Sequence, residues 1–242
     1  MTLALTVLKA SVTLPAGVAG SSMFQGTFDA LPAVANQCEC PVPVVVFMHG
    51  SSGLNDKIRA QQGWLTGTLG VATIAPDSFA VSGRPTYTSP APLDVYERVH
   101  ALRQAEIRDL LDALASQRWA DRTRMLLAGT SEGAVAAARW PGGEFAGRII
   151  YAWSCEDNYF VDGARNGFGP KDAVLNILSA DDPFFSPQSP LNQGLPVAGH
   201  GAAAVCGNPN AQVVLIPGAP HTLFDLPAAR ALTAEFVRSV LA

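Results

Sequence analysis

A serine between two glycines is the residue of this chain best placed for nucleophilic chemistry. The segment 129–133 is Gly-Thr-Ser-Glu-Gly, a G-x-S-x-G pattern with Ser131 at its centre. An apolar run precedes the pattern and an alanine-rich run follows it, so the serine lies on a predicted strand-to-helix turn. On such a turn the glycines leave room for a strained serine with an exposed hydroxyl, and the helix N-terminus faces developing negative charge. We therefore predict that Ser131 is a catalytic nucleophile.

A base must accompany this nucleophile, because a serine hydroxyl attacks poorly at neutral pH without one. His221 follows the last predicted strand and is the candidate for the base. Of the other histidines, His49 ends an earlier predicted strand and is interpreted as structural, and His100 lies within a long predicted helix, where it is solvated or packed. His200, in a loop rich in glycine and alanine, is the remaining competitor.

An acid must orient the base, and the candidate is Asp182, which comes shortly after a predicted strand. Its neighbour Asp181 and the earlier Asp157 are the alternatives, since each also follows a strand end. The order of the predicted triad, Ser131, Asp182, His221, differs from the orders of the two common serine proteases and is that of the α/β-hydrolases.

Two backbone N–H groups are expected to stabilise the oxyanion that forms when the serine attacks a carbonyl. One is the N–H of Glu132, directly after the nucleophile. The other is assigned to Ser51, in the segment His49–Gly53 that follows the third predicted strand. The alternative for this segment is a glycine-rich turn with no catalytic duty.

Aromatic side chains near the predicted strand ends are candidates for the wall of an apolar cleft. Phe79, Trp153 and Phe184 are predicted to contact substrate, with simple core packing as the alternative. Arg84 could meet a substrate carboxylate, but a structural salt bridge with a nearby carboxylate fits the sequence equally well.

Strands and helices that alternate along the chain must position these residues. Short apolar runs predict strands at Leu3–Thr13, Met23–Phe28, Val42–Met48, Val71–Ile74, Met125–Ala128, Arg148–Trp153, Ala173–Leu178 and Gln212–Ile216. Helices are predicted at Lys57–Leu69, Leu93–Ser116, Glu132–Trp140 and Pro227–Leu241. The second helix is expected to begin with a cap formed by Asp94 and Glu97 and to bury the face of Leu102, Ile107, Leu110, Leu111 and Leu114. The pattern predicts a mostly parallel sheet of about eight strands, antiparallel at its start, with helices on both faces.

Composition limits the number of domains and the kinds of partner that this chain can have. The 242 residues suit one domain, 1–242, and 48% hydrophobic against 15% charged residues permits a large core. A formal net charge of −4 argues against nucleic acid or an anionic membrane as partner, and no apolar run is long enough to span a bilayer. Residues 1–8 lack the basic start of a signal peptide. Cys38 and Cys40 are too few for a zinc site, and we expect a monomer or small homo-oligomer.

With these residues placed, the chain resembles the α/β-hydrolase superfamily, and within it the dienelactone hydrolase-like branch, from about Pro41 to the C-terminus. The segments that carry the resemblance are 44–50, the Ala-Pro-Asp-Ser-Phe stretch 75–79, 129–133, 180–184 and 218–221. The resemblance implies a triad of serine or cysteine with aspartate and histidine, no metal or organic cofactor, and a ligand cleft above the sheet. Dienelactone hydrolases proper have a cysteine where this chain has Ser131, which favours a general carboxylic ester over an enol-lactone.

The resemblance also bears on the cysteines and the compartment. Cys155 and Cys206 are placed like two cysteines of related proteins, which suggests a disulfide; free thiols in a reducing cytoplasm are the alternative. A bridge, in a chain from which a signal peptide was removed, would favour a periplasmic or secreted protein, and otherwise the expectation is a cytoplasmic one.

The sequence thus predicts a serine hydrolase that cleaves small-molecule carboxylic esters or lactones. The alternatives are an acyltransferase or small-peptide hydrolase with the same triad, or a non-catalytic ligand-binding protein with the same fold.

Overall fold

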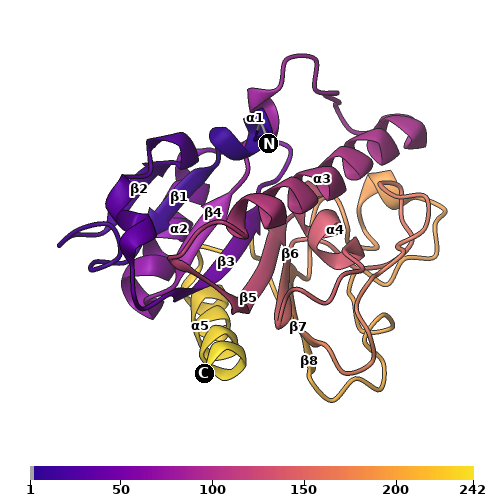
Figure 1. Cartoon of the computed structure of the whole chain (residues 1–242). Helices are drawn as coiled ribbons and strands as arrows, with labels where there is room; N and C mark the ends of the chain where they lie inside the picture. The colour runs from indigo at the N-terminus through magenta and orange to yellow at the C-terminus, as the bar shows by residue number, and fades with distance from the viewer. Residues whose placement is uncertain (1–2) are drawn as a thin grey trace.

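Eight strands form one twisted sheet through the centre of the molecule, in the computed structural model that describes residues 3–242 (Figure 1). The strands are β1 (Ser11–Leu14), β2 (Phe24–Thr27), β3 (Val42–Met48), β4 (Ala72–Ala75), β5 (Ala120–Thr130), β6 (Gly147–Tyr151), β7 (Ala173–Ser179) and β8 (Ala211–Ile216). Their order is β2-β1-β4-β3-β5-β6-β7-β8. β1 pairs antiparallel with β2 and β4, and all the other pairs are parallel. The predicted sheet, mostly parallel with an antiparallel start, is confirmed.

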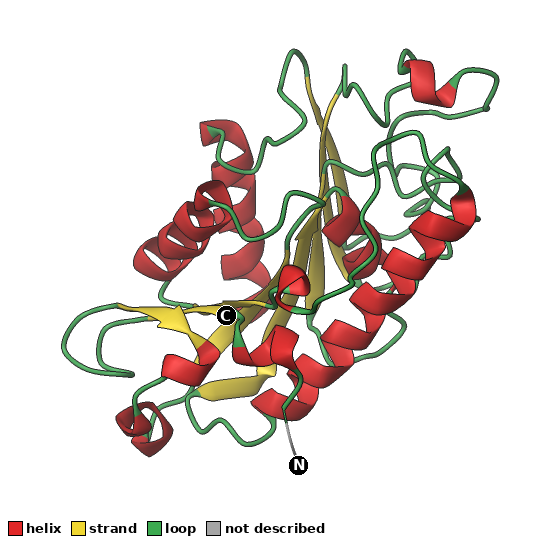
Figure 2. Ribbon diagram, turned by 90° about the horizontal axis from the view of Figure 1, so that it is seen from above, coloured by secondary structure: helices red, strands yellow, loops and turns green. Residues whose placement is uncertain are grey.

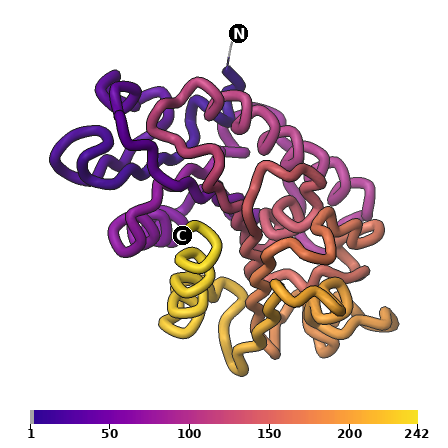
Figure 3. Tube along the Cα trace, turned by 60° about the horizontal axis from the view of Figure 1, so that its bottom comes forward, coloured from indigo at the N-terminus to yellow at the C-terminus, as the bar shows by residue number. Residues whose placement is uncertain are grey.

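Helices cover both faces of the sheet, as Figure 2 shows from above. The longer ones are α2 (Asp56–Leu69), α3 (Leu93–Leu114), α4 (Glu132–Arg139) and α5 (Pro227–Leu241). Val45 and Phe47 of β3 pack toward α2 and α5, whereas the alternate side chains of that strand pack toward α3 and α4. This division follows from the pleat of a strand, which turns successive side chains to opposite faces. α5 at the C-terminus lies beside α2 from the first half of the chain (Figure 3).

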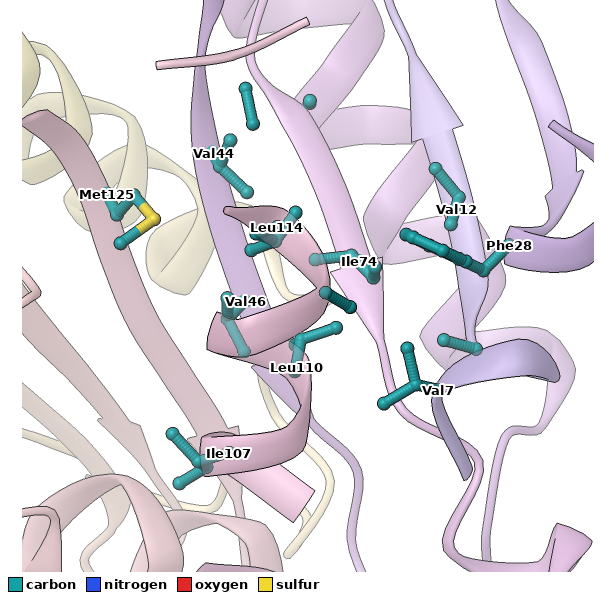
Figure 4. Packing of buried hydrophobic residues seen from close by; sticks show 14 of the residues in the cluster. Val7, Val12, Phe28, Val44, Val46, Ile74, Ile107, Leu110, Leu114 and Met125 are labelled. Carbon is teal, nitrogen blue, oxygen red and sulfur yellow. The ribbon is translucent and has the colours of Figure 1, made fainter. Parts of the chain in front are cut away.

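The core on the α3 side joins the N-terminal segment to the central strands (Figure 4). Val12 of β1, Val46 of β3 and Ile74 of β4 are fully buried there, against Leu110 of α3. The β-branched side chains of the central strands pack against leucines of α3 on this face, and α2 and α5 cover the other face, so these strands are apolar on both faces.

Of the N-terminal strand predicted over Leu3–Thr13, only residues 11–13 are a strand, and the rest of the prediction is wrong. A helical turn, α1 (Leu5–Leu8), precedes the strand β1. This turn contacts α3 and places Val7 in the core on that side of the sheet, and the Thr6 carbonyl oxygen accepts a hydrogen bond from Asp77 N–H at 2.9 Å. An alternating pattern over so few residues does not distinguish the two conformations.

Two smaller expectations also fail. β5 begins at Ala120 instead of Met125, because Ala120 and Asp121 pair with Val42 and Pro43 across a bulge. No side chain caps α3, whose N-cap is Pro92, and Glu97 instead accepts hydrogen bonds from Arg139 on α4.

No helix within residues 3–242 is long and apolar enough to cross a membrane.

Candidate active site

The predicted catalytic residues lie at one edge of the sheet. Ser131 directly follows β5, Ser51 follows β3, Asp182 follows β7 and His221 follows β8. These four strands are parallel, so their carboxyl ends meet at the same edge, where open α/β sheets bind their ligands.

Ser131 is held in a strained backbone conformation at the sharp turn from β5 to α4. Its φ of 54° and ψ of −118° are unusual for any residue with a side chain. The glycines of the pattern permit this turn, because a Cβ on Gly133 would lie 2.0 Å from the carbonyl oxygen of Met48, and one on Gly129 would lie 2.1 Å from that of Gly133. The close approach of Gly133 to Met48 shows that helix α4, which begins directly after the serine, is packed tightly against β3.

This packing predicts a large effect of one methyl group. Gly133→Ala should prevent the native packing of α4 on β3, because the methyl meets backbone atoms that cannot move aside as a side chain does. We expect a loss of at least about 3 kcal/mol of unfolding free energy, the upper range for overpacking, measured by urea denaturation. Gly143→Ala is the control, since a Cβ there meets nothing within 4 Å. Equal stability of the two variants would contradict the tight turn.

His221 and Asp182 are in direct contact. The distance from His221 Nδ1 to Asp182 Oδ2 is 2.8 Å. Asp182 is fully buried, and its Oδ1 accepts hydrogen bonds from the N–H groups of Phe184 (2.9 Å) and Phe185 (3.1 Å). One carboxylate oxygen thus accepts two backbone hydrogen bonds, and the other is directed at the imidazole.

The competitors for these two roles lie elsewhere. Asp181 accepts a hydrogen bond from Gly218 N–H, and Asp157 accepts one from Ala164 N–H. His200 contacts Ala202 N–H within its own loop, and the buried His100 contacts the carbonyl of Phe160. In the part of the chain that the structure describes, none of these side chains contacts His221.

Ser131 and His221 line one small cavity of about 60 Å³. The other lining residues are Gly50, Ser51, Ser52, Gly53, Asn55, Ile58, Thr130, Thr222 and Phe224. Among residues 3–242, no hydrogen bond joins Ser131 Oγ to His221, which is common for catalytic pairs in the absence of substrate.

Of the two expected oxyanion donors, Ser51 lines this cavity and Glu132 directly follows its lining residue Ser131. Ser51 N–H donates no hydrogen bond within the described chain. Glu132 N–H lies in the first turn of α4, where N–H groups have no partner inside the helix. Both donors are therefore available to an incoming oxygen atom.

Arg84 forms the structural salt bridge that was the alternative to a contact with substrate. Its side chain is buried and forms an ion pair with the Glu132 carboxylate, and its Nε donates to Ser78 Oγ at 2.7 Å. The guanidinium also lies 4.2 Å from the ring centroid of Phe79. Its donors are thus engaged inside the protein instead of facing a substrate.

Of the three aromatic residues predicted to contact substrate, two lie near the cavity of Ser131 and one lies in the core. Phe79 is 42% exposed and lines an open groove of about 340 Å³ together with Asp77 and 51–54, next to the cavity of Ser131. The Phe184 ring lies 4.6 Å from the His221 ring. Trp153 is fully buried in a core cluster with Tyr96 and Val135, which is the packing alternative.

Sequence reasoning missed the charged residues beneath the site. Arg103 and Glu106 lie on the buried face of α3 with Ile107 and Leu110, whereas Leu102, which we expected on this face, is only half-buried. Arg103 precedes Ile107 by one helical turn and therefore lies on the apolar face of the predicted helix. This spacing is the sequence feature that could have identified Arg103. An arginine on such a face needs a buried partner.

The suggested disulfide does not form. Cys155 and Cys206 are both free thiols, the first buried and the second exposed, and Cys38 and Cys40 are free as well. Burial raises the pKa of the Cys155 thiol, so this group is an unreactive part of the core. The disulfide therefore no longer supports an exported protein.

Within residues 3–242, no group of three or more histidine, cysteine, aspartate or glutamate side chains could hold a metal ion.

Comparisons with known proteins rest on structure alone. The sequence matches no protein-family model and no curated protein. The structure is similar to that of esterase PE8, with 19% identity, a TM-score of 0.57, and coverage of 95% of this chain and 97% of the other. It is similar to a cold-adapted esterase from an Arctic intertidal metagenomic library, with 16% identity, a TM-score of 0.59, and coverage of 97% and 96%.

A third similar structure is a dienelactone hydrolase-like promiscuous phosphotriesterase from metagenomic libraries, with 18% identity, a TM-score of 0.58, and coverage of 86% and 90%. At these identities the likeness concerns the fold. Together with the strand order and the helices on both faces, it shows that this chain has the α/β-hydrolase fold.

Proposed function

We propose that this chain is a serine hydrolase that cleaves carboxylic esters through an acyl-enzyme. The observation that carries the proposal is one cavity lined by the strained Ser131 and by His221, with Asp182 2.8 Å from the imidazole and an available N–H group on Ser51 and on Glu132. A non-catalytic binding protein would not need this combination. The similar structures include esterases and a dienelactone hydrolase-like enzyme, which supports the same reaction class and the dienelactone hydrolase-like branch.

The proposed reaction begins with attack of Ser131 Oγ on the ester carbonyl while His221 Nε2 takes the hydroxyl proton. Asp182 accepts a hydrogen bond from His221 Nδ1 and stabilises the imidazolium that forms. The carbonyl oxygen becomes an oxyanion between the N–H groups of Ser51 and Glu132. His221 then donates its proton to the leaving alcohol, and afterwards activates the water that releases the acid.

Hydrolysis of p-nitrophenyl esters of graded acyl length tests this proposal. We expect turnover by the wild-type protein that a serine-reactive fluorophosphonate abolishes with stoichiometric labelling. A folded protein that hydrolyses none of these esters and is not labelled would refute the proposed function.

The cavity predicts a preference for short acyl groups. The acyl carbon stays bonded to Ser131 with its oxygen between the two donors, so we place the acyl chain in the cavity that Ser131, Ser51 and His221 line. Its volume of about 60 Å³ is well below the roughly 150 Å³ of an apolar cavity that admits benzene. Acetyl and propanoyl esters should therefore have kcat/KM values at least about tenfold above that of the octanoyl ester, the discrimination that an apolar pocket typically achieves.

Ile58 is a buried aliphatic residue among those that line this cavity. Ile58→Ala should enlarge the cavity and move the optimum toward longer acyl chains. Ile107→Ala removes the same atoms from a buried site in the core on the other side of the sheet, and should leave the chain-length profile unchanged. A profile that is the same in both variants would show that the cavity does not hold the acyl chain.

A further inference from the structure

We propose that a buried ion cluster beneath the site, centred on Arg103, is the device that positions both oxyanion donors. The proposal rests on the proposed function, because it concerns the same oxyanion hole. The cluster consists of two guanidinium groups and two carboxylates, those of Arg84, Arg103, Glu106 and Glu132.

The four charges balance one another in the interior. Arg103 and Glu132 are fully buried, and Arg84 and Glu106 are nearly so. Arg103 donates to Glu106 at 2.7 Å, and its Nε lies 3.7 Å from Glu132 Oε1. Burial raises the pKa of Glu106, and the Arg103 charge opposes this shift. A cluster of this kind adds little net stability, because desolvation of the charges opposes their attraction.

On one side, the cluster holds His49, which precedes the oxyanion segment. Arg103 Nη2 donates to the His49 carbonyl oxygen at 3.0 Å, and its Nη1 lies 3.3 Å from His49 Nε2. Ser78 N–H also points at His49 Nε2, at 3.2 Å. Guanidinium and backbone N–H groups can only donate, so Nε2 is the acceptor and the ring proton is on Nδ1. Burial and the Arg103 charge hold the pKa of His49 well below its usual value, which keeps the ring neutral.

The tautomer of His49 determines where the Ser51 N–H points. His49 Nδ1–H donates to the Gly50 carbonyl oxygen at 2.7 Å, and Gly53 N–H donates to the same oxygen at 3.1 Å. The Gly50 carbonyl and the Ser51 N–H belong to one trans peptide, in which the two bonds point in opposite directions. Two hydrogen bonds that fix the carbonyl therefore direct the Ser51 N–H to the other side, where it has no partner in the described chain.

On the other side, the cluster holds Glu132, whose N–H is the second donor. The Glu132 carboxylate pairs with Arg84 and accepts a hydrogen bond from Tyr87 Oη at 2.7 Å. Arg84 in turn binds Ser78, whose N–H contacts His49. Arg103 thus lies between His49, whose ring helps to orient the Ser51 N–H, and Glu132, which carries the second donor. We infer that Arg103 sets the spacing of the two donors as a positioning residue.

Arg103→Lys tests this inference, because lysine keeps the charge but lacks the planar guanidinium whose two Nη atoms contact His49 and Glu106. We expect kcat for the acetyl ester to fall about ten- to a hundredfold with KM within about twofold, since small misplacements of catalytic groups have effects of this size. Affinity for a trifluoromethyl ketone, which forms an oxyanion on Ser131, should fall in parallel. Arg103→Met should have a larger effect on both.

Arg139→Lys is the matched control. Arg139 is also a nearly buried arginine, bound to Glu97 through two hydrogen bonds of 2.9 and 3.0 Å, but it contacts neither His49 nor Glu132. If both lysine variants lose kcat equally, or if Arg103→Lys changes KM alone, Arg103 has a structural role only and the inference is wrong.

A second measurement does not need turnover. In ¹⁵N-labelled protein, Arg103→Lys should shift the amide resonances of Ser51 and Glu132, and Arg139→Lys should leave them in place. Unmoved Ser51 and Glu132 resonances would overturn the inference even in an active enzyme. A wild-type protein without esterase activity would refute the proposed function instead, and the resonances would still decide the role of Arg103.

Discussion

Replacing Ser131 by alanine is expected to abolish ester hydrolysis, with a loss of kcat of up to about a millionfold, the effect of removing a catalytic serine in comparable enzymes. The acyl-enzyme cannot form without Oγ, and no other hydroxyl occupies the turn at the start of α4 in the same strained conformation. The measurement is hydrolysis of p-nitrophenyl acetate beside the wild type, together with labelling by a fluorophosphonate.

The fold should survive this change. Alanine has the same Cβ as serine and therefore keeps the backbone strain at φ 54° unchanged. We expect an unfolding free energy within about 0.5 kcal/mol of the wild type. Retained hydrolysis by this folded variant would refute Ser131 as the nucleophile.

Replacing Asp182 by asparagine should lower kcat by about 10⁴-fold, the loss expected when the triad acid becomes an amide. The reason lies in the partners of the two oxygens. Oδ1 accepts hydrogen bonds from the N–H groups of Phe184 and Phe185, so the asparagine oxygen must take that position and its NH₂ must face His221. The NH₂ then donates to Nδ1, which leaves the proton on Nε2, where the imidazole can no longer accept one from Ser131.

Asp181→Asn is the matched control for this prediction. It is the same chemical change in the adjacent residue, whose carboxylate accepts a hydrogen bond from Gly218 N–H and does not contact His221. Its kcat should remain within about twofold of the wild type, because a substitution away from the reacting groups has a small effect. If Asp181→Asn causes the large loss and Asp182→Asn does not, the acid is Asp181.

Both predictions begin with residues that the sequence alone singled out. Seven of the eight strands and the four longer helices could be predicted, because apolar periodicity and glycine or proline at the ends are local signals. Ser131, Asp182 and His221 could be named before their distances were known because each follows a predicted strand, and the carboxyl ends of parallel strands meet at one edge of the sheet. Their catalytic roles stay predictions until the variants are measured.

Other features had no local signal. The helical turn at Leu5–Leu8 depends on contact with α3, which lies about ninety residues away in the chain. The sequence named Asp182 ahead of Asp181, but the 2.8 Å distance from Asp182 to His221 that supports this choice exists only in the folded chain. Cys155 and Cys206 are free thiols because of the conformation of the loop after β7. The resemblance in their placement along the sequence did not predict this conformation.

By itself, the sequence determined the class of fold, the serine on its turn and the types of its partners, because each is encoded in a few consecutive residues or in the order of elements. The tertiary structure decided the environment of these groups. Arg84 pairs with Glu132 across 48 residues, and Arg103 reaches His49 across 54. A buried charge selects its partner by distance and by the absence of water, and neither is visible before the elements pack. The cavity volume that predicts short acyl groups arises in the same way, from side chains that meet only in the folded chain.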